Sequence, residues 1–109
     1  MPVTLVSILE GRTPAQKLSL MEAVQTAIAT TLKLPPHDRN LRLCVHGRDE
    51  WLLPEGKGDA YTLVEIALFA GRTPETKSAL YAAIVDALEA QGVPRGDVFL
   101  RIIEQPREN

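Results

Sequence analysis

Apolar residues along this chain gather in four short runs that have the composition of β-strands. The runs at 3–9 and 62–69 are rich in aliphatic and β-branched residues, and a glycine follows each of them closely. Two further runs, at 41–46 and 98–104, have the same character. Because short runs of this kind bounded by turn formers are typical of strands, the pattern predicts four strands.

Between the two strands of each pair, apolar residues recur every three or four positions, which is the period of an α-helix. The two stripes consist of Leu20, Met21, Val24, Ala27, Ile28 and Leu32, and of Leu80, Ile84, Ala87 and Leu88. Thr13 and Thr73 stand where an N-cap hydroxyl accepts a free N–H group, and a proline follows each at the first helical position. Gln16 completes a capping box with Thr13. We therefore predict two capped helices.

The chain contains an internal duplication. The octet EGRTPAQK at 10–17 recurs as AGRTPETK at 70–77, and the similarity continues through both helical segments. Repetition over this length indicates that each copy is one supersecondary unit. We expect a single domain of 109 residues, built from repeats 1–46 and 61–104 that are joined by a linker at 47–60.

Two strand-helix-strand units predict an α+β fold with a four-stranded sheet and both helices on one face. The strands are nevertheless apolar on both faces, since Val3 and Leu5 alternate with Val6 and Ile8. A large uncovered apolar face is typical of an interaction surface. We therefore expect the chain to oligomerise sheet to sheet; the alternative is a monomer with a partly apolar sheet surface.

Charge, apolar run length and cysteine content exclude several kinds of partner and site. The formal net charge of −2 argues against a broad phosphate-binding surface, so no nucleic-acid partner is expected. No apolar run reaches transmembrane length, and the start of the chain lacks the pattern of a secretion signal, so we expect a cytoplasmic protein without a membrane partner. Cys44 is the only cysteine, which excludes an internal disulfide and a cysteine-built zinc site. Cys44 itself is expected to be a packed thiol rather than a nucleophile.

Several features of the sequence together resemble those of a known family. Pro2 directly after the first methionine, a strand, Glu-Gly-Arg-Thr, a capped helix and a proline-terminated loop resemble the tautomerase superfamily. The duplicated form is similar to its long-chain members near malonate semialdehyde decarboxylase, through the segments LFAGRTPETKSALY, PPHDR and DVFLRIIEQPREN. The resemblance covers essentially the whole chain. It implies a β-α-β fold, homotrimers whose sheets surround a central axis, and catalysis by an N-terminal proline without a cofactor or metal.

Pro2 presents a secondary amine once Met1 is removed. Burial and a nearby arginine both disfavour the charged amine, so they would lower its pKa and make it a base near neutral pH. Kept charged, it is a general acid, and with a carbonyl substrate it could form an iminium. The alternative is that Pro2 only permits removal of Met1 and starts a strand. Pro2 aligns with Thr62, which has no free amine, so each chain would hold one catalytic amine.

Three arginines are candidates for binding a substrate carboxylate, because the guanidinium group is planar, always charged and able to pair bidentately. Arg12 and Arg72 stand between a strand and a helix N-terminus, a place that favours anions. By the resemblance, Arg72 matches a substrate-binding arginine of the decarboxylase-like branch and ranks above Arg12, which matches the short tautomerases. Arg42 matches another of their arginines less closely, since two extra residues intervene.

Asp38, in the loop after the first helix, resembles the aspartate that assists water activation or proton transfer in the decarboxylase-like branch. The alternative is a turn residue that supports entry into the strand. The sequence departs from this branch at Ala70, where the relatives carry a second arginine. It also reaches Pro-Arg-Glu-Asn where related chains usually continue into a tail that can close the pocket.

The predicted function is cofactor-independent tautomerisation of a small 2-oxo or enol carboxylic acid, with Pro2 transferring the proton. Two alternatives stay open. One is hydration, dehalogenation or decarboxylation in the same pocket, with Pro2 as an acid and Asp38 assisting water. The other is a non-catalytic oligomeric binding module.

Overall fold

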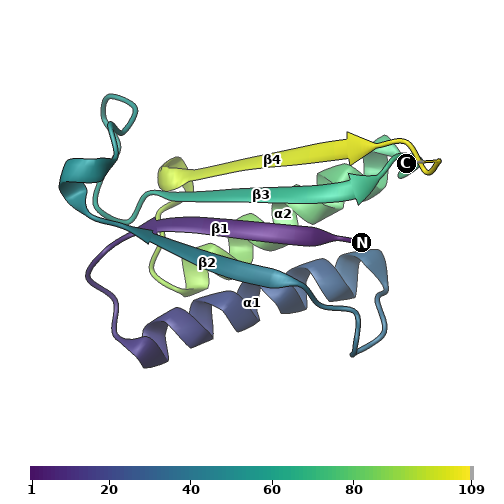
Figure 1. Cartoon of the computed structure of the whole chain (residues 1–109), viewed down its shortest axis with the longest axis horizontal. Coiled ribbons are helices and arrows are strands. Elements are labelled where there is room, and N and C mark those ends of the chain that lie inside the picture. Colours follow the sequence, from purple (N-terminus) through teal and green to yellow (C-terminus); the bar gives the residue numbers. More distant parts are fainter. Residues whose placement is uncertain (109) are drawn as a thin grey trace.

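The computed structural model describes residues 1–108, and its elements follow the predicted order (Figure 1). They are the strands β1 (Val3–Leu9), β2 (Leu41–His46), β3 (Thr62–Phe69) and β4 (Val98–Gln105), the helices α1 (Pro14–Leu32) and α2 (Pro74–Ala90), and the 3-10 turns η1 (Arg48–Glu50) and η2 (Arg95–Asp97). Each half is a β-α-β unit, which confirms the predicted fold class. Asn109, the last residue of the predicted domain, lies outside the described residues.

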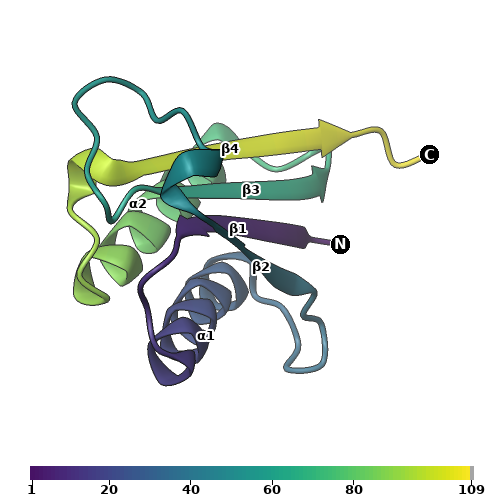
Figure 2. The same ribbon diagram turned by 60° about the vertical axis from the view of Figure 1, so that its left-hand side comes forward.

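The four strands form one mixed sheet in the order β2-β1-β3-β4. β1 is parallel to β2 and β3 is parallel to β4, whereas the central pair β1 and β3 is antiparallel. Val3 is level with Ala67 and Ile8 with Thr62, so β1 begins beside the end of β3. The start of β1 and the end of β4 consequently lie at the same end of the sheet, as Figures 1 and 2 show from two directions.

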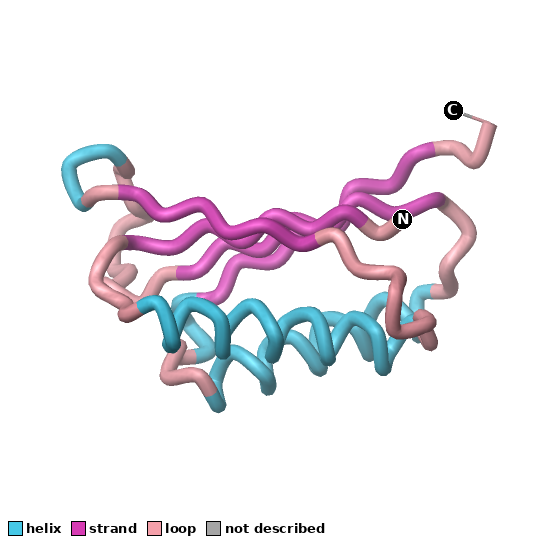
Figure 3. The backbone as a smooth tube through the Cα atoms, turned by 60° about the horizontal axis from the view of Figure 1, so that its bottom comes forward, coloured by secondary structure: helices cyan, strands magenta, loops and turns pink. Residues whose placement is uncertain are grey.

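The core lies between the sheet and the two helices, which cover the same face of the sheet (Figure 3). Alternate residues of the central strands point into it, while the helices contribute the stripes that their spacing predicts. Its fully buried aliphatic residues include Val6, Ile8, Leu20, Val24, Ile28, Val64, Ile66, Leu80, Ile84 and Leu88. The core thus determines which side of each strand faces the helices, and the helices do not cover the opposite side of the sheet.

Both helices begin at the predicted threonine caps. The Gln16 N–H donates to the Thr13 hydroxyl at 3.2 Å, and the Thr13 N–H donates to the Gln16 side-chain oxygen at 2.9 Å, which confirms the capping box. In the second helix, the Thr76 N–H donates to the Thr73 hydroxyl at 3.1 Å. α1 ends where Lys33 adopts the left-handed conformation, with φ of 56°.

The uncovered face of the sheet is apolar with charged interruptions. Leu5 on β1 is level with Arg42 on one side and with Glu65 on the other, and Glu65 is level with Arg101. The Arg101 Nε lies 3.5 Å from a Glu65 carboxylate oxygen. Cys44, expected to be packed, is exposed because it stands on the side of β2 that faces away from the helices. We call this surface the open face.

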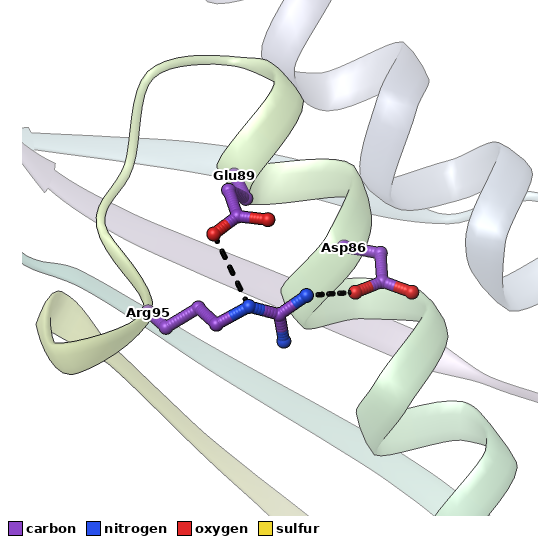
Figure 4. A network of polar contacts seen from close by, with 3 residues as sticks. All are labelled: Asp86, Glu89 and Arg95. Carbon is purple, nitrogen blue, oxygen red and sulfur yellow. Dashed lines mark hydrogen bonds and ion pairs between the residues drawn. The ribbon is translucent and has the colours of Figure 1, made fainter.

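Arg95 in η2 connects the turn before β4 to the last part of α2 (Figure 4). Its Nε donates to Glu89 at 3.1 Å, and a terminal nitrogen donates to Asp86. The hydrogen bond to Asp86 and the nearby charge of Glu89 raise the pKa of Arg95 above its usual value. Since the cluster is exposed, it orients the turn more than it stabilises the fold.

None of the helices within residues 1–108 is long and apolar enough to cross a lipid bilayer.

Candidate active site

The candidate site lies at the end of the sheet where β1 begins. Pro2 is buried and directly precedes Val3, which is level with Ala67 of β3. Continuation of this antiparallel register places Pro2 beside the last residues of β3, which ends at Phe69. The turn into α2 follows at once and carries Arg72. The sheet topology therefore brings the start of the chain to the turn that holds this arginine.

Arg72 is half-buried and stands one residue before the N-cap Thr73. Among residues 1–108 it forms no ion pair. The first N–H groups of α2 are close to it in the chain, and the positive end of the helix dipole acts in the same direction. The guanidinium is thus available to an anion that enters at this end of the sheet.

The loop between α1 and β2 reaches the same end, because the Thr4 N–H donates to the Asn40 carbonyl at 2.9 Å. Asp38 lies in this loop and is half-buried. Its N–H donates to the Pro35 carbonyl at 3.0 Å, and its own carbonyl accepts a bond of 3.5 Å from Gln25. These contacts occupy the backbone of Asp38 and involve neither of its carboxylate oxygens.

The two remaining predicted arginines come from other parts of the sheet. Arg42 is exposed on the open face, level with Leu5, three residues along β1 from Pro2. Arg12 follows the opposite end of β1, which is level with Thr62 at the start of β3. Within one chain, Arg12 is therefore separated from Pro2 by the length of the sheet.

The end of the sheet near Arg12 is covered by the linker. Trp51 packs edge-on against His46 and Tyr61, with ring centroids 5.1 and 5.5 Å apart. Tyr61 is buried, and Trp51 is half-buried. The aromatic cluster closes this end of the molecule and lies away from Pro2.

Sequence reasoning did not single out two side-chain contacts at the Pro2 end. The Arg107 guanidinium lies over the Phe69 ring, with its carbon 5.5 Å from the ring centroid. Lys77 in the first turns of α2 forms an ion pair of 2.5 Å with Glu104 of β4. Both contacts depend on the pairing of β3 with β4, which no local pattern specifies.

A groove of about 460 Å³ lies beside this site, between α1 and the chain that leads into β2. Its lining includes Leu18, Met21, Gln25, Arg39, Asn40 and Leu41. Pro2, Asp38 and Arg72 are not part of this lining. Within residues 1–108, no three His, Cys, Asp or Glu side chains gather in a way that could hold a metal ion.

The fold, with Pro2 at the start of β1 and Arg72 in the turn before α2, can be compared with known families of proteins. Residues 38–109 match the model of a family described as tautomerase enzyme. The chain belongs to this tautomerase family, and it is an isomerase-type enzyme.

Solved structures of related proteins share the fold over almost the whole chain. A malonate semialdehyde decarboxylase is 26% identical, with a TM-score of 0.86 over 95% of this chain and 84% of that chain. A fused 4-OT that forms a symmetric trimer is 30% identical, with a TM-score of 0.88 over 98% of this chain and 88% of that chain. The FG41 malonate semialdehyde decarboxylase, solved after inhibition by 3-bromopropiolate, is 31% identical, with a TM-score of 0.79 over 95% and 83% of the two chains.

Proposed function

We propose that this enzyme is a cofactor-independent tautomerase that interconverts the keto and enol forms of a small 2-oxo carboxylic acid. The observation that carries the proposal is the position of Pro2, buried at the end of the sheet beside the turn that holds Arg72. Arg72 binds the carboxylate, and the Pro2 amine moves a proton between the enol oxygen and the neighbouring carbon. Arg12 and Arg42 are proposed as further carboxylate-binding groups.

The amine exists only after Met1 is removed, because Met1 otherwise converts the Pro2 nitrogen into an amide. Burial of Pro2 favours the neutral amine, and so does the positive charge of a nearby arginine. A neutral secondary amine can accept a proton at neutral pH and return it to the substrate carbon. The proposed chemistry therefore needs no group beyond the chain and its substrate.

A second candidate function is hydration or decarboxylation at the same place, with the charged Pro2 amine as the acid. Asp38 favours it, since its loop lies at the Pro2 end and the backbone contacts of Asp38 leave its carboxylate uncommitted. One related structure is described in terms of both decarboxylase and hydratase activities. In this reaction Asp38 would activate the water that attacks the substrate.

The functional form is proposed to be a homotrimer. No helix or strand of residues 1–108 covers the open face of the sheet (Figure 3), and related fused 4-OT proteins form symmetric and asymmetric trimers. Packing of three open faces would remove this surface from water. It would also allow Arg12 of one subunit to approach the Pro2 end of another. The cytoplasmic location stays a prediction from the sequence.

The decisive experiment is ketonisation of 2-hydroxymuconate and of phenylenolpyruvate, followed by ultraviolet absorbance. The Pro2→Ala variant should lose about 10²–10⁴-fold in kcat, the usual contribution of a positioned acid or base. Mass spectrometry must show that Met1 is absent from both proteins. If Pro2→Ala keeps the kcat of the parent enzyme, the tautomerase proposal is wrong.

The direction of the pH–rate profile separates the two candidate functions. A rate that rises with pH through the amine's pKa identifies Pro2 as a base, as tautomerisation requires. A rate that falls identifies it as an acid, and loss of that activity in Asp38→Asn would favour the hydratase or decarboxylase.

A further inference from the structure

The groove between α1 and the chain that leads into β2 has one helical wall and one wall of extended chain. Five residues of α1 line it at intervals of three and four positions, so they lie on one side of the helix. They are Leu18, Met21, Glu22, Gln25 and Thr26. The opposite wall is the segment 39–41. The volume of about 460 Å³ is within the range of about 300–1,000 Å³ that is typical of small-molecule sites.

The lining combines apolar side chains with two opposite charges. Leu18 is 55% exposed, and Met21 and Leu41 are half-buried, so the groove offers apolar surface to a ligand. Glu22 on α1 and Arg39 on the opposite wall are both exposed. Within residues 1–108, they form no ion pair with each other or with another residue. The groove lies beside β2, at the edge of the sheet opposite to β4.

Opposite charges on the two walls of one groove, unpaired with each other, suit a ligand that carries both charges. A guanidinium pairs with a carboxylate, and a side-chain carboxylate accepts hydrogen bonds from an ammonium group. The side-chain amides of Gln25 and Asn40 belong to the same lining and supply further donors and acceptors. An apolar substituent on the ligand would remove the surface of Leu18 from water.

We propose that this groove binds a free α-amino acid with an apolar side chain. Arg39 holds the carboxylate of the amino acid, Glu22 holds its ammonium group, and Leu18 and Met21 contact its side chain. The inference goes beyond the proposed function, because it concerns a second site whose lining does not include Pro2.

The groove also shares residues with the loop that carries Asp38. Gln25 lines the groove, and its side-chain amide donates to the Asp38 carbonyl at 3.5 Å. Arg39 and Asn40 follow Asp38 directly, and the Asn40 carbonyl accepts the Thr4 N–H at 2.9 Å. A ligand that is held by Arg39 therefore opposes local opening of this loop, because the open loop would release it.

Titration of the isotope-labelled full chain, followed by nuclear magnetic resonance, tests the site. Leucine is the probe; 4-methylpentanoate lacks its ammonium group, and 3-methylbutylamine lacks its carboxylate. Leucine should cause saturable shifts of the amide signals of the groove residues. Its affinity should exceed that of either analogue about threefold to tenfold, between the contribution of an exposed ion pair and that of a charged hydrogen bond.

Two variants assign the two charges of the ligand. Glu22→Gln should lower the affinity for leucine to that for 4-methylpentanoate, whose own binding should not change. Arg39→Gln should lower it to that for 3-methylbutylamine, again without an effect on that analogue. Glu55→Gln and Arg95→Gln remove charges outside the groove and should alter none of these affinities. The inference is overturned if no shift saturates, if the shifts lie elsewhere, or if leucine binds no better than its analogues.

Hydrogen exchange of the Asp38 amide, which donates to the Pro35 carbonyl at 3.0 Å, tests the link to the loop. Leucine at about ten times its Kd should slow this exchange about tenfold, since opening must then compete with binding. The Lys57 amide, which donates to the Pro54 carbonyl in the linker, should exchange at an unchanged rate. An unchanged rate at Asp38 in the presence of bound leucine would contradict the link.

Discussion

At the scale of single residues, the two Gly-Arg-Thr-Pro turns differ in what surrounds them. Arg12 and Arg72 occupy the same position in the repeated octet. Because β1 and β3 are antiparallel, the turn after β3 lies beside Pro2, whereas the turn after β1 lies beside Thr62. Within one chain, Arg72 therefore shares an end of the sheet with the Pro2 amine, and Arg12 does not.

We therefore expect the two arginines to contribute unequally to substrate binding. Arg72→Ala should raise KM for a carboxylate substrate about tenfold or more with a smaller change in kcat, since a contact used in ground and transition states is lost. Arg12→Ala should have a smaller effect. Steady-state kinetics with phenylenolpyruvate measures both. The reverse ranking would mean that the pattern of the short tautomerases applies and that Arg12 acts across a subunit boundary.

At the scale of elements, most boundaries could be predicted because their signals are local. The predicted strands at 3–9, 41–46 and 62–69 agree with β1, β2 and β3. β4 extends one residue beyond the predicted run, to Gln105, because it continues to pair with Phe69. Thr13 and Thr73 cap the helices as predicted, since a cap depends only on the residues of the first turn.

The candidate site could be predicted only in part, because its residues are brought together by the pairing of strands that are far apart in the sequence. Pro2 and Arg72 are identified from local signals, but they share one end because β1 and β3 pair antiparallel, a direction that the two β-α-β units do not specify by themselves. The contact of Arg107 with Phe69 depends on the register of β3 against β4 and on a turn after the last strand. Nothing in the local sequence specifies that register, so this cation was missed.

The capping box of α1 offers a test of local stability away from Pro2. Thr13→Ala removes the acceptor of the Gln16 N–H, and it should lower the free energy of unfolding by about 1 kcal/mol. Thr13→Ser keeps the hydroxyl and should cost much less. Urea denaturation at fixed protein concentration, followed by circular dichroism, measures the difference. Equal stability of Thr13→Ala and the parent chain would show that the cap contributes nothing.

At the scale of the whole molecule, the helices cover one face of the sheet and leave the other open (Figure 3). The charged residues Arg42, Glu65 and Arg101 are level with Leu5 in one row across the open face. Apolar residues such as Val3, Leu63 and Phe99 lie on either side of this row. Such a surface combines apolar area for association with charges that can set the orientation of the partner.

We predict that the chain sediments as a homotrimer at micromolar concentration and that Leu5→Glu dissociates it. The new carboxylate would stand between Glu65 and Arg42 in the middle of the packed faces, where the cost of taking a charge out of water exceeds what one neighbouring cation returns. Ala82→Glu, on an exposed position of α2, is the control and should leave the mass unchanged. Sedimentation equilibrium distinguishes the masses; a monomeric parent chain would refute the assembly.

Because both ends of the described chain lie at the Pro2 end of the sheet, a tag at either end of the chain would stand at the proposed site. An affinity tag fused before Pro2 would turn the amine into an amide, and one fused after β4 would crowd the same end of the sheet. The linker lies at the other end of the molecule (Figure 1), where Leu52 is 100% exposed. A tag, a dye or a surface tether is therefore best placed between Pro54 and Gly56, ahead of the bond from Lys57 to the Gly96 carbonyl.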